Sequence, residues 1–402
     1  MNSTWKLYGK NIEDVSIFEI SNDERCLPMD GRTRTILFDD VYITLPQEEN
    51  PERVITSYIY GTRVEGSNRR EIIVVQNSLF EDIYKAYFPP IGLFLSSNTD
   101  VYIYNNTFSE VSTNYGSMMI YFANNIVMEN NTLSSCIDYQ FSLVQLYFIF
   151  GDITIEGLYL DAVTSKVIQS HYCIHIMPLW GNSITVNDFR VTNSQFYSQN
   201  IFTIDSSSYD LFLSNVTVQN SEVSIDHSLL VFDSANMIII SDVIFLNIKG
   251  ISTDYSDSYM ISISNLNLAS SNDSTIQNIT VQEASLGFFN FESIMNEPTQ
   301  SRQFKVVDVS IINSQYTNRV DIFSFGRISI SKDFTIQMVR THFESLSFKF
   351  GGNLINMQAL INNGVVVTDS KASDIKGGSL RIEAFNKQSL TIPAKLSKLL
   401  SL

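Results

Sequence analysis

Short runs of alternating apolar and polar residues recur along the whole chain, and most of them lose their rhythm at an Asn or Asp. In "LFLSNVTVQN" (211–220), apolar residues hold alternate positions up to Leu213, Asn215 interrupts, and alternation resumes at Val216. Because successive side chains of a β-strand point to opposite faces, each run predicts a strand with one buried face. The interruption at Asn215 therefore predicts a bend between two strands.

The same bend recurs about every 30 residues, in thirteen segments that align on it. Two positions before the bend the residue is apolar in every segment, and three positions after it the residue is apolar in nearly all of them. The alignment places Gln76 and Met338 at the bend in two segments. In the other eleven the bend is Asn, Asp or Gly, types that favour the left-handed backbone region and turns: Asp14, Asp40, Asn105, Asn130, Gly157, Asp188, Asn215, Asp242, Asn278, Asp308 and Asp369.

A third strand precedes several of these bends. Apolar-rich runs at 117–122, 143–148, 200–205 and 228–233 are each followed by a few polar or small residues before the next strand. No part of the repeat region shows helical periodicity, and strands that return in one direction must pair in parallel. Since parallel crossovers are right-handed, we expect an all-β, right-handed parallel β-helix of about a dozen coils with three short strands per coil.

The repeats predict a single β-helix domain over residues 1–385, followed by a tail or cap at 386–402. In "IPAKLSKLLSL" the leucines fall on one side of a helix, so we expect a short capping helix over the last coil. The variable segments Pro51–Arg70 and Gly250–Ser258 are expected to be loops that the solenoid displays.

In this patterning the chain resembles the pectin-lyase-like right-handed β-helix superfamily, over about residues 10 to 380. Within it, the Asn- and Ser-rich repeats look most like surface proteins of unicellular eukaryotes, whose β-helices often lie outside a membrane anchor. The superfamily holds both enzymes and non-enzymatic surface proteins, so the fold alone does not assign an activity. A leucine-rich repeat is excluded because its Asn follows the last strand leucine by three residues, whereas here Asn105 follows Ile103 by two.

Charge narrows the range of partners. The formal net charge is −16 and the pI is near 4.6, which argues against nucleic acid, since phosphate binding requires clustered Lys and Arg. The longest apolar run, Leu143–Phe150, is too short for a membrane helix, and "MNSTWKLYGK" does not have the form of a signal peptide. We therefore expect no transmembrane segment here and take the chain to be a fragment of a longer membrane-anchored surface protein.

The sequence indicates no cofactor or metal. Cys26, Cys136 and Cys173 are too scattered for a disulfide framework or a zinc site and are expected to be small buried residues. His171 and His175 have the spacing of a helical metal site, but four residues of strand place them about 13 Å apart. We interpret them as structural histidines.

The resemblance also implies what an enzyme of this fold would contain. Glycosidases of this type carry an Asn-Thr-Asp motif, an Asp pair and a Gly-His-Gly in that order. The chain has Asn98, Thr99 and Asp100, but its Asp pair, Asp39 and Asp40, comes earlier, and none of its four histidines lies in Gly-His-Gly. Asp100 is interpreted more simply as the polar residue that leads into the next strand.

Sequons are the most specific chemical signal. Four of them fall in the bend column, where the repeat itself favours Asn, and one lies in the variable segment "LASSNDS" and is the best candidate for a real glycan. The acceptor residues are Asn2, Asn105, Asn130, Asn215, Asn272 and Asn278.

Together these features predict a non-catalytic scaffold, extracellular or at the cell surface, that presents loops for binding or adhesion. Its partner would be a surface component or carbohydrate ligand. The alternative is a carbohydrate-active enzyme, a polysaccharide lyase or glycoside hydrolase, of the same fold. A group of carboxylates contributed by adjacent coils would favour the enzyme.

Overall fold

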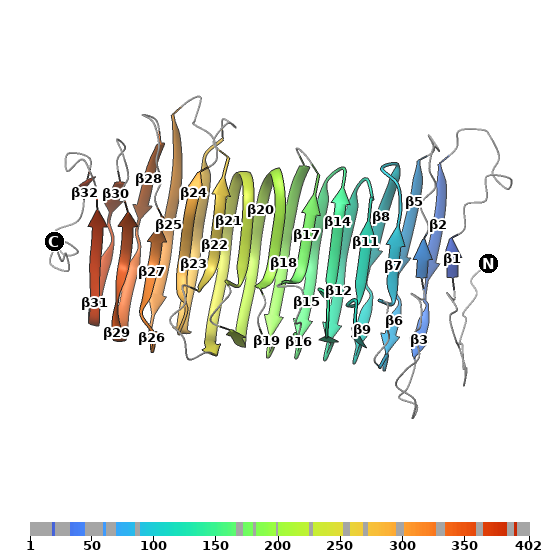
Figure 1. The fold of residues 1–402 in the computed structure, drawn as a ribbon, viewed down its shortest axis with the longest axis horizontal. Helices are drawn as coiled ribbons and strands as arrows, with labels where there is room; N and C mark the ends of the chain where they lie inside the picture. Colours follow the sequence, from blue (N-terminus) through green and yellow to red (C-terminus); the bar gives the residue numbers. More distant parts are fainter. Residues whose placement is uncertain are drawn as a thin grey trace. The chain divides into compact units, whose positions relative to one another are not determined.

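The computed structural model describes residues 18–20, 33–44, 59–61, 70–84, 89–165, 172–179, 182–197, 200–224, 228–251, 258–267, 272–294, 301–326, 334–358, 365–383 and 390–391 (Figure 1). The described residues form strands and turns and contain no helix. The chain divides into two compact units, Met1–Gln199 and Asn200–Leu402, and each is a stack of parallel strands.

The first unit contains three ladders of strands. One ladder runs through β2 (Arg34–Asp39), β5 (Glu71–Gln76), β8 (Thr99–Tyr104), β12 (Ile126–Ser134), β15 (Ile153–Asp161) and β18 (Asn182–Thr192). The second runs through β3 (Tyr42–Thr44), β6 (Leu79–Glu81), β9 (Thr107–Ser109) and the later halves of β12, β15 and β18. The third runs through β1 (Phe18–Ile20), β4 (Ile59–Gly61), β7 (Ile91–Phe94), β11 (Met118–Tyr121), β14 (Val144–Ile149) and β17 (Tyr172–Pro178).

Two-residue strands form a short fourth ladder in the first unit: β10 (Ser112–Thr113), β13 (Ile137–Asp138), β16 (Thr164–Ser165) and β19 (Gln195–Phe196). The second unit repeats the pattern with longer strands that continue through the bends. Its elements are β20 (Asn200–Ser224), β21 (Leu230–Ile251), β22 (Tyr259–Leu266), β23 (Ser274–Ala284), β24 (Gly287–Ile294), β25 (Arg302–Ile312), β26 (Gln315–Tyr316), β27 (Val320–Phe325), β28 (Phe334–Val339), β29 (His342–Gln358), β30 (Val365–Thr368), β31 (Lys371–Glu383) and β32 (Leu390–Thr391).

The parallel β-solenoid predicted from the repeats is confirmed. Leu213 pairs with Ile240, Ile240 with Ile276, and Ile276 with Val306, so the apolar column before the bend is stacked coil on coil. All four side chains are buried. The described residues make about nine turns, fewer than the dozen expected.

The bend residues have the backbone conformation that their side-chain types favour. The φ angles are positive at Asp40, Asn105, Asn130, Gly157, Asp188, Asn215, Asp242, Asn278, Asp308 and Asp369, between 53° and 69°. Asp14 lies outside the described residues. At Gly157 a Cβ atom would lie 2.7 Å from Oδ1 of Asn130 on the preceding coil, so this bend has both a conformational and a steric reason for glycine.

Two repeats were aligned wrongly, because the bends occur at Asn77 and Arg340 instead of Gln76 and Met338. In the run "EIIVVQN" four apolar residues in succession hide the alternation, and it is Val75, not Val74, that is buried. Arg340 has no intrinsic preference for a positive φ. Its guanidinium instead forms two hydrogen bonds with Asp308, at 2.5 and 2.6 Å, on the preceding coil.

A second bend follows five residues after the first and was not among the sequence predictions. Its residues also have positive φ, and six of the eleven are Asn or Asp. They are Asp82, Glu110, Ser135, Ala162, Asn193, Asn220, Asn247, Glu283, Asn313, Ser345 and Asp374. Each coil therefore turns twice within a few residues before it reaches the third ladder.

The interior is mainly apolar, and the first unit contains a buried polar ladder. Asn106 and Asn131 follow the bends of adjacent coils and are fully buried. Asn131 Oδ1 accepts hydrogen bonds from the backbone N–H and from Nδ2 of Asn106, both at 3.1 Å, and Asn106 Oδ1 accepts the N–H of Ser78 at 3.0 Å. Buried amides are tolerated here because each one is hydrogen-bonded to the next coil.

The predicted display loops, 51–70 and 250–258, lie mostly outside the described residues. The same holds for the predicted capping helix in 386–402, where the structure describes only β32, which pairs in parallel with β30. Within the described part of the chain, no helix has the length and apolar character needed to cross a membrane.

Candidate functional site

Asp100, the acidic residue of the Asn98-Thr99-Asp100 motif, lies at the start of β8 and is 1% exposed. Nη2 of Arg70 contacts its Oδ2 at 2.7 Å, and Nδ2 atoms of Asn124 and Asn125 donate to its Oδ1 at 2.7 and 2.9 Å. Burial raises the pKa of this carboxyl, but the hydrogen bonds from Arg70 and the two Asn side chains outweigh burial and lower it overall. Asp100 is therefore an ionised link between coils, and its geometry suits structure better than catalysis.

His175, one of the two histidines with the spacing of a metal site, lies in β17. The Tyr147 hydroxyl and Nδ1 of His175 are 2.6 Å apart, and the imidazole is also packed against the ring of Tyr172. Burial lowers the pKa of His175 to about 4, so the ring is neutral at pH 7. Burial also raises the pKa of the Cys173 thiol. His171 lies outside the described residues, as do His227 and Cys26.

Asp39 and Asp40, the Asp pair of the sequence, also have structural roles. Asp39 Oδ1 accepts a hydrogen bond from Nδ2 of Asn77 on the next coil at 2.9 Å, and Asp40 is the bend residue. His342 is half-buried, with its Nε2 2.9 Å from Oε2 of Glu344. These residues do not come together with Asp100 in any contact among the described residues.

A group of carboxylates that the sequence analysis missed lies on the second unit. Asp205 ends the third-ladder segment of β20, and Asp233 lies directly opposite it on the next coil. Burial, and then the charge of Asp233, raise the pKa of Asp205. Burial raises the pKa of Glu292 in β24, a hydrogen bond from Asn290 opposes this, and the charge of Asp233 adds to the increase.

Asn265 holds this carboxylate group in place, because its Nδ2 donates to Asp233 Oδ1 at 2.6 Å. A carboxyl with a raised pKa beside a second carboxylate is the arrangement used for general acid–base chemistry. The signal was present in the sequence, since "NIFTID" and "SLLVFD" align with an Asp at the end of each run.

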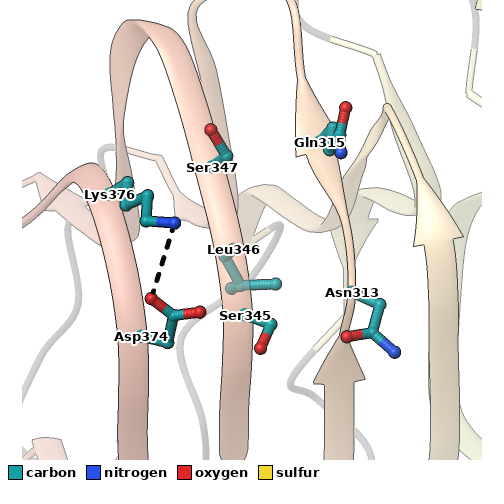
Figure 2. A pocket seen from close by; sticks show the side chains of 7 residues that line it. All are labelled: Asn313, Gln315, Ser345, Leu346, Ser347, Asp374 and Lys376. Atoms are coloured by element: carbon teal, nitrogen blue, oxygen red, sulfur yellow. Dashed lines mark ion pairs between the residues drawn. The ribbon is translucent and has the colours of Figure 1, made fainter.

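The second unit also carries a polar groove of about 250 Å³ on its surface (Figure 2). Three coils line it: Ser345, Leu346 and Ser347 lie between Asn313 and Gln315 on one side and Asp374 and Lys376 on the other. Nζ of Lys376 is 3.8 Å from Oδ1 of Asp374. Asn313, Ser345 and Asp374 are the second-bend residues of these coils, so the groove follows the stacking direction.

The sequon residues that the structure describes are all exposed, whereas Asn2 lies outside the described residues. Nδ2 of Asn105 donates to Asn77 Oδ1 at 3.3 Å, and Nδ2 of Asn278 donates to Asp242 Oδ1 at 3.1 Å. In the Asn272 sequon the hydroxyl residue is Ser274, which is buried. Its Oγ accepts a hydrogen bond from the N–H of Ile238 at 3.1 Å. The exposed glycan-acceptor residues are Asn105, Asn130, Asn215, Asn272 and Asn278.

Across the described residues, no group of three or more His, Cys, Asp or Glu side chains is arranged to hold a metal ion. A scan against protein-family models and searches of curated proteins and of solved structures found no match to this chain.

Proposed function

We propose that this chain is a non-catalytic repeat scaffold, extracellular or at the cell surface, that presents its outer surface and loops for binding or adhesion. We further propose that it belongs to a larger membrane-anchored protein. The resemblance of its repeats to pectin-lyase-like surface proteins of unicellular eukaryotes supports the proposal.

The observation that carries this proposal is the regular stacking of polar side chains at the bends of successive coils. In both units exposed polar side chains repeat once per coil, and many are hydrogen-bonded to the neighbouring coil. In the second unit, Nδ2 of Asn247 donates to Asn220 Oδ1 at 3.0 Å, and Arg340 bonds to Asp308. Such links hold polar groups at strand spacing, about 4.8 Å, and make a surface that loses little entropy when it binds.

Binding to cells tests this function. The fluorescently labelled chain, made with and without enzymatic deglycosylation, is added to cells of the native host and to a glycan array. Saturable binding to either one supports the scaffold. A chain that binds neither, or that is unmodified at all of its exposed sequons when isolated from the host, contradicts a surface location with a binding role.

The second candidate, a carbohydrate-active enzyme, is favoured by one observation, the Asp205 and Asp233 carboxylates on adjacent coils, with Glu292 two coils beyond Asp233. Wild type and the variants Asp233→Asn and Asp100→Asn are incubated with a polysaccharide panel, and new reducing ends are measured. Cleavage that Asp233→Asn abolishes and Asp100→Asn retains would establish the enzyme. Absence of cleavage by wild type leaves the scaffold as the better proposal.

A further inference from the structure

The groove of Figure 2 owes its depth to a difference in side-chain size between adjacent coils. Along the second-bend column the residues are Asn313, Ser345 and Asp374, and Gln315, Ser347 and Lys376 follow two positions later on the same coils. The two serines of the middle coil are half-buried, while the residues of the flanking coils are exposed. A pair of small residues between larger ones leaves a hollow whose floor is the buried Leu346.

The polar groups in this hollow are available to a ligand. The side chains of Asn313, Gln315, Ser345 and Ser347 have no hydrogen-bond partner among the described residues. Elsewhere in the same column such groups bond to each other, as Asn247 does to Asn220. The groove thus differs from the coils of Asn220 and Asn247, and it leaves amide and hydroxyl groups pointing outward.

The chemistry of the lining limits what could fill it. One ammonium and one carboxylate, 3.8 Å apart, give the groove no net charge, which disfavours an anion or a cation. Two side-chain amides each offer a donor and an acceptor in the same geometry as a peptide group. Three coils at strand spacing extend about 10 Å, which matches about three residues of extended polypeptide.

We propose that this groove binds a short extended peptide segment, of about three residues, that lies along the stacking direction of the coils. Asn313 and Gln315 bond to its main-chain amides at one end, and the Ser345 and Ser347 hydroxyls bond at the centre. Asp374 and Lys376 accommodate a polar or charged side chain at the other end. The inference deepens the proposed binding function by naming a class of partner, and it rests on that function.

The test fills the groove without disturbing the coil. Ser345→Asn with Ser347→Gln gives the middle coil the same residues as its neighbour, and Asn is tolerated at a bend with positive φ. Ser135→Asn is the matched control, since Ser135 has the same place in the second bend of the first unit, with a φ of 53°, and is exposed. Thermal unfolding of all three proteins verifies that they fold.

The probe is a library of tetrapeptides with acetylated and amidated ends, presented to the full chain on an array. We expect dissociation constants on the order of 1 mM for the best sequences. The filled variant should bind about tenfold more weakly, and the Ser135→Asn control should match wild type. Replacing the central amide of a bound peptide by an ester removes one N–H donor and should weaken binding about fivefold.

Three results would overturn the inference: no tetrapeptide binds, the filled variant binds as well as wild type, or a neutral oligosaccharide occupies the groove in place of peptide. The cell-binding assay separates this outcome from failure of the scaffold function. Cell binding that survives the filled groove removes only the peptide site. Peptide binding by a chain that binds neither cells nor the glycan array removes the surface function and keeps the site.

Discussion

Two carboxylates lie beside the same connection of the repeat, the one from the third ladder to the first, and their pKa values shift in opposite directions. Asp100 lies in a strand of the first unit just after that connection, and Asp205 ends a strand segment of the second unit just before it. Arg70 and two Asn side chains lower the pKa of Asp100, whereas burial and Asp233 raise the pKa of Asp205. In a stacked coil the residue on the next coil is within reach, so a neighbouring cation or amide lowers the pKa of a carboxyl, whereas a neighbouring carboxylate adds to the increase caused by burial.

The largest expected effect is the loss of Asp100. Asp100→Ala leaves the Asn124 and Asn125 amides and the Arg70 guanidinium without their acceptor at a buried position. We expect a loss of about 2 kcal/mol in the free energy of unfolding, measured by urea denaturation at pH 7. Asp100→Asn, which keeps one acceptor oxygen, is the control and should lose less. Equal stability of Asp100→Ala and wild type would show that the network adds nothing.

The loss of stability in the Asp100 variants should also depend on pH, which sharpens the comparison of Asp100 with Asp205. The folded pKa of Asp100 is lowered from 3.8, so its contribution to stability is fully present above 3.8 and disappears as the pH falls through the folded value. The difference between wild type and Asp100→Asn should therefore be largest at neutral pH and shrink in acid. Denaturation midpoints over a pH series measure it, and a difference that grows toward acid would contradict the assignment.

A smaller effect of opposite sign is expected at Asp205. Its folded pKa is raised from 3.8, so the ionised group destabilises the fold above the folded value, and this cost is relieved as the pH falls toward 3.8. Asp205→Asn should stabilise the chain by roughly 0.5 kcal/mol at pH 7, the scale of a like-charge pair across strands. The gain should fade in acid. If the variant is less stable than wild type at pH 7, burial and repulsion do not make the ionised Asp205 a cost to the fold.

The sequence predicted the repeating framework but not the contacts between coils. Alternation and the Asn or Asp at the first bend depend on local backbone preferences, and Asn215 could be assigned from its neighbours alone. The bend at Arg340 could not, since arginine has no preference for a positive φ and its partner Asp308 lies 32 residues away. The second bends are hard to predict because residues such as Ala162 and Glu283 hold the same place as Asn and Asp.

The functional groups were harder to predict because they depend on which side chains face each other across a coil. Asp205 and Asp233 are separated by 28 residues in sequence, and only the register of β20 with β21 shows that they are directly opposite. Ser345 and Ser347 are ordinary in sequence, and they form a hollow only because the flanking coils carry longer side chains at the same positions. A repeat pattern gives the columns, and the sizes and charges within each column give the sites.

The smallest expected effect separates the two causes of the raised pKa at Asp205. Asp233→Asn removes the neighbouring charge and leaves burial, which is the larger cause, unchanged. The pKa of Asp205, followed by NMR titration of its carboxyl carbon, should therefore fall without returning to the ordinary value. Arg70→Gln provides the mirror experiment, because it removes the cation beside Asp100 and should raise the pKa of that carboxyl. If Asp233→Asn leaves the titration of Asp205 unchanged, the two carboxylates do not act as a pair, and the enzyme candidate loses the observation on which it depends.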